Sequence, residues 1–250
     1  MRAPSGTEQT LRRAPTFMTN INSETTVAEI VRAEPGRARV FERLGIDYCC
    51  GGKKPLAEIC AGKGLDPANV LRLVREFDAE QAAPAADVAA MSLVQLCDHI
   101  ESTHHGYLIE ELPRLDFMTR KVATVHGTKE PRLLQLRQVF ETFNKQTSAR
   151  IKAEGETIFP AIRQLDSGNR AVSVTKPNLK LLLDEADAGN RNTGVVLESF
   201  KAATNNYTPP DWACNTFRSM YGRFARLAEK MDANIDTERN VLFPKALAAA

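Results

Sequence analysis

Residues 153–162 read A-E-G-E-T-I-F-P-A-I, and residues 237–246 read T-E-R-N-V-L-F-P-K-A. In each stretch a glutamate, Glu154 or Glu238, stands five positions before a Phe-Pro pair. The residue one helical turn before each glutamate, Arg150 or Asn234, shares a helix face with it. Helical bundles build metal sites from matched carboxylates on facing helices. The repeat therefore predicts a helical bundle with a polar centre.

The overall composition is that of a globular protein. Its 250 residues are 43% hydrophobic and 26% charged, and Ala, Leu, Glu, Lys and Arg, which favour helices, abound. A net charge of +2 gives no footprint for a nucleic-acid partner. No apolar run approaches the roughly 20 residues of a membrane helix, so we expect no membrane partner. Five cysteines, an odd number, do not suggest a secreted disulfide framework, and we expect a reducing cytoplasm.

The N-terminal third divides into a tail, a small domain and a linker. Residues 1–22 are rich in Arg, poor in acid and without the apolar core of a secretory signal, so we expect a disordered tail rather than an organellar transit peptide. Residues 23–83 have short helical patterns and predict a small helical domain. Residues 84–91 form a Pro/Ala-rich stretch that we interpret as a linker.

The small domain contains two adjacent cysteines. Residues 45–55 read G-I-D-Y-C-C-G-G-K-K-P, which places Cys49 and Cys50 in a tight turn before a helix. The neighbouring Lys53 and Lys54 would favour thiolates there. Two interpretations stay open from the residues alone: a pair of reactive thiols, or a pair of small buried hydrophobic side chains.

The rest of the chain has the apolar periodicity of long helices. Apolar residues recur every three or four positions over residues 92–120, 131–165 and 178–203, and again from about residue 211. Four long amphipathic helices with moderate connections are typical of a four-helix bundle, here residues 92–250. We therefore predict an all-α fold.

Several polar residues stand where this periodicity predicts core positions. They are Arg150, Glu154, Asn190, Asn234 and Glu238. Polar side chains are rarely buried without partners, so their convergence predicts either a metal site or a closed network of ion pairs and amides. His105 begins an apolar stripe and can face the same centre, although a single histidine is also compatible with an ordinary hydrogen-bonded side chain.

Five motifs together are specific enough to indicate a family. They are D-Y-C-C-G-G (47–52), H-H-x-Y-L-x-x-E-L-P-R-L (104–115), V-H-G-x-x-x-P (125–131), the two copies of E-x4-F-P, and T-N-N-Y-T-P-P (204–210). From about residue 25 to 247 the chain resembles the repair-of-iron-centres family. The resemblance implies a small Cys-Cys domain followed by a hemerythrin-like, up-down bundle. It also implies a non-haem di-iron centre and a role in restoring iron–sulfur clusters damaged by nitric oxide or oxidants.

The ligand positions of that family are only partly kept. The resemblance implies that His105, His126, Glu154 and Glu238 are metal ligands. The family has histidines where this chain has Arg150, Asn190 and Asn234, and no histidine follows His126. A guanidinium is no ligand, and an amide oxygen is a weak one for iron. We therefore predict that an ordinary di-iron centre does not form.

Three functional hypotheses follow from this mixture. The first is a repair protein whose metal site has fewer ligands and holds one metal ion on the four that remain. The second is a metal-free relative that acts as a binding or regulatory partner. The third assigns nitric-oxide or redox chemistry to Cys49 and Cys50. The partners that the resemblance implies are damaged iron–sulfur proteins or a regulator, with a second copy bound through the N-terminal domain.

Overall fold

The computed structural model describes residues 21–48, 52–82, 86–166 and 175–250. The chain separates into two compact units, residues 1–79 and 80–250. No strand occurs in the described ranges, where Thr26 and Pro55 form an isolated bridge, so the predicted all-α class is confirmed. No helix within these ranges is both long and apolar enough to cross a membrane.

The first unit is a small helical domain. Its elements are α1 (Val27–Ala33), η1 (Pro35–Arg37), α2 (Ala38–Arg43), α3 (Leu56–Lys63) and α4 (Pro67–Ala82). A capping box between Thr26 and Glu29 starts α1, because each residue satisfies a backbone N–H of the other. The buried Arg37 guanidinium donates to both carboxylate oxygens of Asp78, at 3.0 and 2.8 Å, and so joins η1 to α4.

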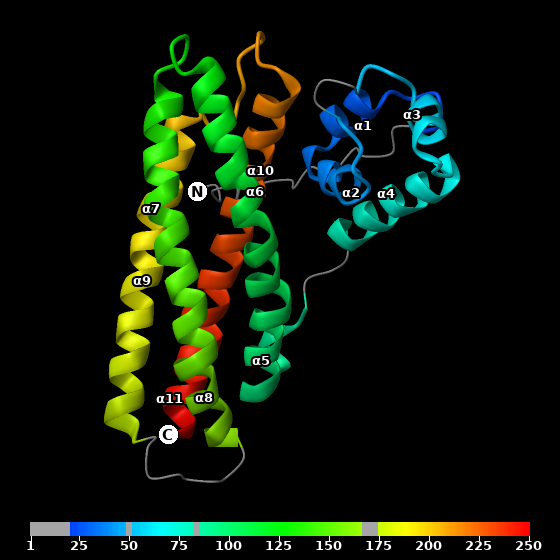
Figure 1. Ribbon diagram of the computed structural model, residues 1–250. Helices are drawn as coiled ribbons and strands as arrows, with labels where there is room; N and C mark the ends of the chain where they lie inside the picture. Colours follow the sequence, from blue (N-terminus) through cyan, green and yellow to red (C-terminus); the bar gives the residue numbers. More distant parts are fainter. Residues whose placement is uncertain (1–20, 49–51, 83–85, 167–174) are drawn as a thin grey trace, which may run out of the picture. The chain divides into compact units, whose positions relative to one another are not determined.

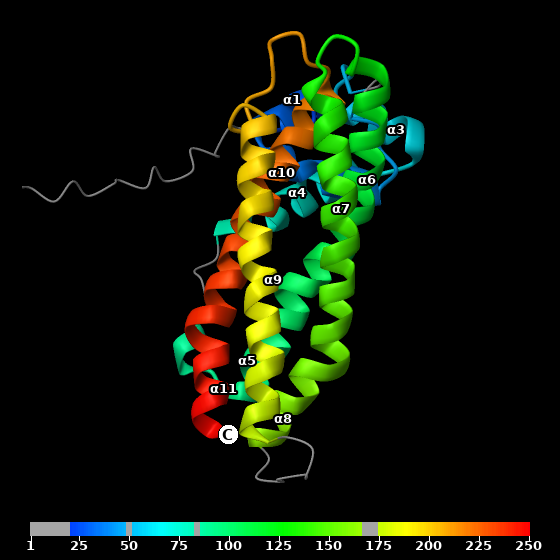
Figure 2. The ribbon, with the colours of Figure 1, turned by 90° about the vertical axis from the view of Figure 1, so that its left-hand side faces the viewer.

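The second unit is the predicted four-helix bundle (Figures 1 and 2). Its four rods are α5 (Leu93–Ile100), η3 (Glu101–His105) and α6 (Gly106–His126); α7 (Arg132–Ala153), η4 (Glu154–Ile158) and α8 (Phe159–Asp166); α9 (Lys176–Ala203); and α10 (Asn215–Thr237), η5 (Glu238–Leu242) and α11 (Phe243–Ala249). A short turn, η2 (Val88–Ala90), precedes the first rod. Contacts join α6 to α7, α7 to α9, α9 to α10 and α10 to α6, which closes the bundle.

The rods differ from the predicted helices mainly at their ends. The first continues to His126 instead of ending near Arg120, because Val122 and Ala123 extend the buried stripe. His126 therefore belongs to the helix and not to the following loop. The fourth rod begins at Asn215, after the N-cap residue Cys214, and not near Asp211.

The bundle core consists of two apolar clusters on either side of a polar layer. One cluster includes Leu112, Phe140, Phe200 and Phe224, with the Phe200 and Phe224 ring centroids 4.8 Å apart. The other lies toward α5, α8 and α11. In all four rods the sequence passes from one cluster to the other through buried polar residues. The predicted core positions are thus occupied, and the polar side chains are concentrated at one level.

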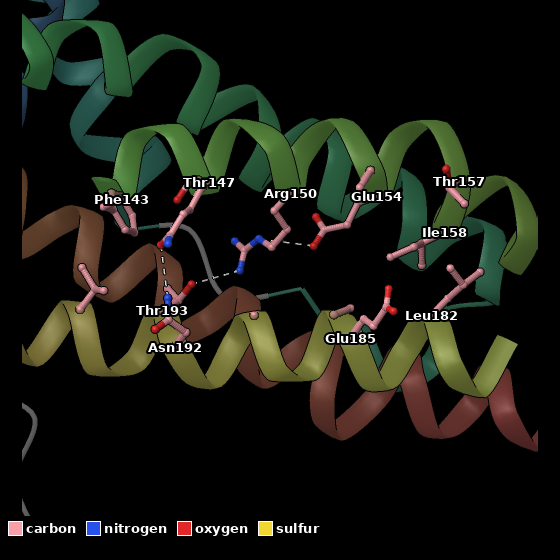
Figure 3. Close-up of a pocket in the computed structure, with 15 residues that line it drawn as sticks. Phe143, Thr147, Arg150, Glu154, Thr157, Ile158, Leu182, Glu185, Asn192 and Thr193 are labelled. Atoms are coloured by element: carbon pink, nitrogen blue, oxygen red, sulfur yellow. Dashed lines mark hydrogen bonds and ion pairs between the residues drawn. The ribbon is translucent and has the colours of Figure 1, made fainter. Parts of the chain in front are cut away.

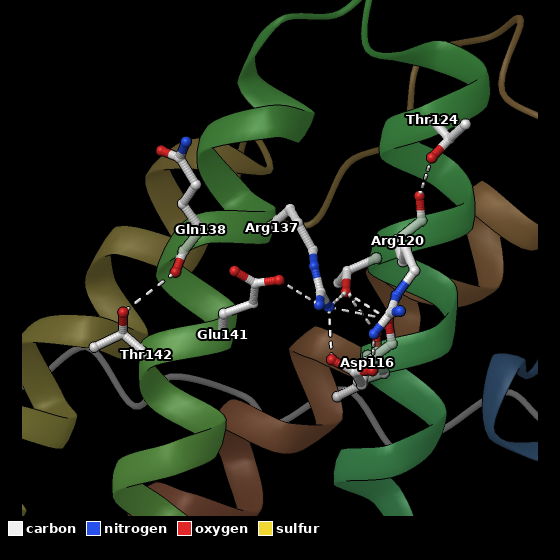
Figure 4. Close-up of polar contacts among 9 residues, drawn as sticks. Asp116, Arg120, Thr124, Arg137, Gln138, Glu141 and Thr142 are labelled. Atoms are coloured by element: carbon white, nitrogen blue, oxygen red, sulfur yellow. Dashed lines mark hydrogen bonds and ion pairs between the residues drawn. The ribbon is translucent and has the colours of Figure 1, made fainter.

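Outside this layer, α6 and α7 are joined by an arginine cluster (Figure 4). The Arg137 Nη1 donates to Asp116 Oδ1 at 2.7 Å and to Thr119 Oγ1 at 2.9 Å, and Arg137 Nη2 donates to Glu141 Oε1 at 2.5 Å. The contacts with Asp116 and Thr119 join α6 to α7, whereas the contact with Glu141 lies within α7.

Candidate functional site

Three of the four rods change their helical geometry at the polar layer. A five-residue π-helical turn ends at His105, another begins at Glu154, and a third begins at Glu238. In each, the backbone N–H after the turn donates to the carbonyl five residues earlier, as Phe159 does to Glu154. Isolated π-helical turns within α-helices are frequent at functional sites. All three place a polar side chain of the centre at one end of the turn.

The Phe-Pro pairs explain two of these turns. Pro160 and Pro244 are each the second residue after the turn, η4 or η5. A proline inside a helix lacks the N–H for the regular hydrogen bond, and its ring collides with the carbonyl four residues before it. A local π-helical turn is one of the adjustments that accommodate such a break. The motif therefore couples each glutamate to a wider helical turn.

The first glutamate is paired with cationic or ionisable groups. Glu154 Oε2 lies 2.7 Å from His105 Nε2, and both side chains are buried. Glu154 Oε1 lies 3.4 Å from the Nε of Arg150, one turn earlier on α7. The His105 ring stacks on Phe159, with ring centroids 5.5 Å apart and an interplanar angle of 9°. Glu154 therefore has a histidine on one side and a guanidinium on the other.

The second glutamate is held by amides. Glu238 is fully buried and accepts hydrogen bonds from Asn190 Nδ2 at 2.7 Å and from Asn234 Nδ2 at 2.8 Å. Burial, together with the charge of Glu154, raises the pKa of Glu238 to about 7, although Arg150 and the two amides act in the opposite direction. Near neutral pH both the protonated and the ionised form of this carboxyl group are therefore populated.

Arg150 joins the two halves into one network. Its Nη1 donates to Asn190 Oδ1 at 2.8 Å and reaches Thr193 Oγ1 at 3.5 Å. Asn190 in turn donates to Glu238, so the chain of contacts runs from His105 through Glu154, Arg150 and Asn190 to Glu238. The sequence predicted every member of this chain, whereas the contact with Thr193 was not expected.

A cavity of about 480 Å³ adjoins this network between α7, η4 and α9 (Figure 3). The figure shows Arg150 reaching from one wall toward Thr193 on the other, with the Glu154 carboxylate turned toward Arg150. Apolar side chains complete the walls, among them Phe143, Ile158, Leu182 and Val196. The guanidinium thus lines a pocket whose walls combine polar and apolar side chains.

The donor set does not fit a di-iron centre. Such a centre needs several imidazoles and carboxylates from the four helices, whereas this layer supplies one imidazole and two carboxylates. Glu154 Oε2 is within hydrogen-bond distance of His105 Nε2, and both carboxylate oxygens of Glu238 accept hydrogen bonds from amides. No group of three His, Cys, Asp or Glu side chains within the described ranges is arranged to hold a metal ion.

Two buried acceptors in the layer are left without a hydrogen-bond partner among the described residues. They are Glu154 Oε1, which faces Arg150 at ion-pair distance only, and Asn234 Oδ1. Both have exposures of 1% or less. Leaving a buried acceptor unpaired costs about 1–3 kcal/mol, so the contacts of Arg150 and Asn234 do not fully satisfy the layer.

The other predicted site residues are not part of this network. His126 is the last residue of α6, 21 residues after His105, which corresponds to roughly 30 Å along a helix. Its Nε2 lies 3.4 Å from Cys214 Sγ. The structure therefore separates His126 from the other three candidate ligands. Cys49 and Cys50 lie outside the described residues.

Comparison with known protein families gives two matches. Residues 23–77 match a domain of unknown function, DUF542, and residues 97–246 match the hemerythrin HHE cation binding domain. The second match covers most of the bundle, including the polar layer.

The chain is also similar over most of its length to curated proteins. It is 32% identical over 222 residues to the iron-sulfur cluster repair protein YtfE of Escherichia coli O1:K1, covering 89% of this chain and 96% of that protein. Two staphylococcal proteins named iron-sulfur cluster repair protein ScdA are 31% identical (Staphylococcus haemolyticus) and 28% identical (Staphylococcus epidermidis), each covering 90% of this chain and 99% of the relative. The chain therefore belongs to the family of iron-sulfur cluster repair proteins that join a DUF542 domain to a hemerythrin HHE bundle.

Proposed function

We propose that this chain acts in iron–sulfur cluster repair, through a bundle whose polar centre is held by side chains instead of a di-iron pair. The observation that carries the proposal is the position of Arg150. Its guanidinium lies 3.4 Å from Glu154 and donates to Asn190, where the family places histidines on both helices. The family role and the altered centre are thus parts of one proposal.

The positive charge of Arg150 opposes metal binding at this centre. Arg150 cannot be deprotonated in a protein, so a fixed positive charge lies beside the carboxylate that would bind the first metal ion. An iron ion at this place would be repelled by the guanidinium and would find, besides the two glutamates and His105, only the amide oxygens of Asn190 and Asn234. Conversely, two buried carboxylates without any cation would be costly, and Arg150 supplies the compensating charge.

A repair protein without a resident di-iron centre would act by binding. The partner we propose is a damaged iron–sulfur protein or a regulator that responds to the damage. The metal-free bundle is self-consistent for this purpose, because its buried charges are paired internally. The role does not require the bundle to take up or release iron.

Metal analysis tests the altered centre. Wild-type protein expressed with ample iron should contain iron far below one atom per chain and lack near-ultraviolet oxo-to-iron bands. The matched variant carries Arg150→His, Asn190→His and Asn234→His, which restores the family histidines and should increase bound iron. Adding Glu238→Ala to that variant should lower it again. Two iron atoms per wild-type chain would overturn the proposed centre, whatever the variants do.

A cellular assay tests the repair role separately. In bacteria that lack their own repair protein, an iron–sulfur enzyme inactivated by nitric oxide should recover faster when this chain is expressed. The control is a strain that expresses the same amount of an unrelated helical bundle. Recovery at the control rate, with this chain present as folded protein, would contradict a role in repair.

A further inference from the structure

Two motifs that the polar centre does not use lie near one end of the bundle. The V-H-G motif ends α6, the T-N-N-Y-T-P-P motif precedes α10, and both loops lie at the same end of the bundle in Figures 1 and 2. There the Cys214 Sγ lies 3.4 Å from His126 Nε2, within hydrogen-bond distance for sulfur. A nucleophile and a base therefore face each other roughly 30 Å from the polar layer.

The thiol is accessible and the imidazole is held in place. Cys214 is exposed, whereas His126 is half-buried against Trp212 and Phe217, with ring centroids 5.6 and 5.7 Å away. These two rings also contact each other edge to face, with centroids 5.7 Å apart, so the imidazole belongs to a trio of packed rings. The base is packed, and the nucleophile it contacts is open to solvent.

The chain before Cys214 is fixed by a single arginine. The Arg218 guanidinium donates to the carbonyl oxygens of Pro210, Asp211 and Ala213, at 3.2, 2.5 and 3.1 Å. Three consecutive residues earlier in the loop, 205–207, have φ values of 49°, 55° and 59°, which non-glycine residues rarely adopt. Backbone strain of this kind persists only where surrounding contacts impose it. The thiol is thus held at a defined position on its loop.

We propose that Cys214 and His126 form a reactive thiol site that takes low-molecular-weight disulfides, preferably anionic ones. With the His126 proton on Nδ1, the thiol donates to Nε2 and passes its proton to that nitrogen. The Cys214 thiolate attacks one sulfur of the disulfide, a new Sγ–S bond forms, and the original S–S bond breaks. The departing thiolate takes up the proton from His126, which returns to its neutral form, and no further oxidant is needed.

The surroundings support the preference for anions. The Lys129 Nζ lies 3.9 Å from the centroid of the Trp212 ring, and this ring packs against His126. Cys214 is also the N-cap residue of the 23-residue helix α10, and the N-terminal end of a helix dipole attracts anions. Both features would attract an incoming anionic reagent.

The other described cysteines lack these features. Cys60 and Cys97 are buried, and burial raises the pKa of both thiols, that of Cys97 to about 12. The inference is independent of the repair proposal, because it involves none of the residues of the polar layer.

The test measures modification of each cysteine in the full-length protein. The probe is the anionic aromatic disulfide 5,5′-dithiobis(2-nitrobenzoate), with the modified cysteine assigned by peptide mass spectrometry. At pH 7 we expect Cys214 to react roughly tenfold faster than N-acetylcysteine amide, and Cys60 and Cys97 far more slowly. His126→Gln should reduce the Cys214 rate to that of the free thiol at pH 7. At pH 10, where ordinary thiols ionise unaided, wild type and variant should converge.

Two controls separate chemistry from loss of structure. His99→Gln changes a half-buried histidine elsewhere and should leave the Cys214 rate unchanged. Lys129→Gln should slow the anionic probe more than it slows the cationic disulfide cystamine. If His126→Gln does not fold, the wild-type rate relative to the free thiol decides. A Cys214 rate no higher than that of N-acetylcysteine amide at pH 7, or one unaffected by His126→Gln, would overturn the proposal.

Discussion

The two copies of the Glu-x4-Phe-Pro motif have the same backbone geometry, but their glutamates are stabilised by different partners. Glu154 and Glu238 each begin a π-helical turn, and each is almost completely buried. Glu154, however, lies between a histidine and a guanidinium, whereas Glu238 accepts hydrogen bonds from two neutral amides. The motif thus determines where a carboxyl group is placed, while the residue one turn earlier determines how its charge is compensated.

The two copies also depend on each other. Arg150 contacts the first glutamate directly and reaches the second through Asn190. The positive charge of Arg150 therefore compensates two buried carboxyl groups. Because one positive charge cannot balance two negative ones, Glu238 can hold a proton near neutral pH. Two buried carboxyl groups can thus share one centre when one cation and two amides lie beside them.

Removing the Arg150 guanidinium should have the largest effect on stability, because both glutamates depend on its charge. Arg150→Met keeps an unbranched, flexible side chain, although a shorter one, and leaves two buried carboxyl groups without the guanidinium. We expect the free energy of unfolding of the metal-free protein to fall by about 3–5 kcal/mol in urea titrations at pH 7. The double variant Arg150→Met, Glu154→Gln should recover most of this loss, because it also removes the uncompensated charge.

The matched control for this effect is Arg150→Lys. It preserves the positive charge but not the planar fork that reaches Glu154 and Asn190 together, so its loss should be clearly smaller. Equal stability of wild type and Arg150→Met would show that the two glutamates do not depend on this cation.

The bundle was predictable because burial and helical period leave a repeated pattern in the sequence. Residues such as Phe140, Phe200 and Phe224 recur at helical spacing and are all buried. The polar members of the stripes, including Arg150 and Asn190, were identified by the same rule. The helix ends were less predictable, because Val122 and Ala123 add one more buried turn that a moderate apolar pattern does not distinguish from the start of a loop.

The π-helical turns and the pairings could not be derived from periodicity. A π-helical turn alters the backbone without altering which residues are apolar, and only Pro160 and Pro244 give a signal for it. The third turn, which ends at His105, is followed by Gly106 and has no such signal. The distance between His105 and His126 was, by contrast, within reach: at about 1.5 Å per helical residue, 21 residues separate them too far to share one metal.

The raised pKa of Glu238 should make the free energy of unfolding depend on pH by about 3 kcal/mol. The pKa of Glu238 is raised from its ordinary value of 4.5 to about 7, so between these values the folded state holds a proton that the unfolded state has lost. Stability from this group is therefore complete below pH 4.5 and is lost as the pH rises through 7. Glu238→Gln should remove this dependence.

The measurement must be a difference between variant and wild type. Burial lowers the pKa of His104 to about 4, and this group adds stability as the pH rises from 4 to 6.5, which opposes Glu238. The free energy of unfolding of wild type minus that of Glu238→Gln should fall by about 3 kcal/mol from pH 4.5 to well above 7, since His104 cancels in the subtraction. A pH-independent difference would mean that Glu238 is not the group that holds the proton.

The smallest expected effect distinguishes the two amides of the second copy. Asn234→Ala removes one hydrogen bond to Glu238 and an acceptor that is already unpaired among the described residues, so we expect a loss of about 1 kcal/mol. Asn190→Ala removes a bond to Glu238 and the acceptor of Arg150, and should cost about 2 kcal/mol. Asn240→Ala, on the exposed side of η5, is the matched control and should change stability by less than about 0.5 kcal/mol. If all three variants lost the same stability, the amides would be packing groups only, and the contrast between a charge-paired Glu154 and an amide-bound Glu238 would no longer explain the centre.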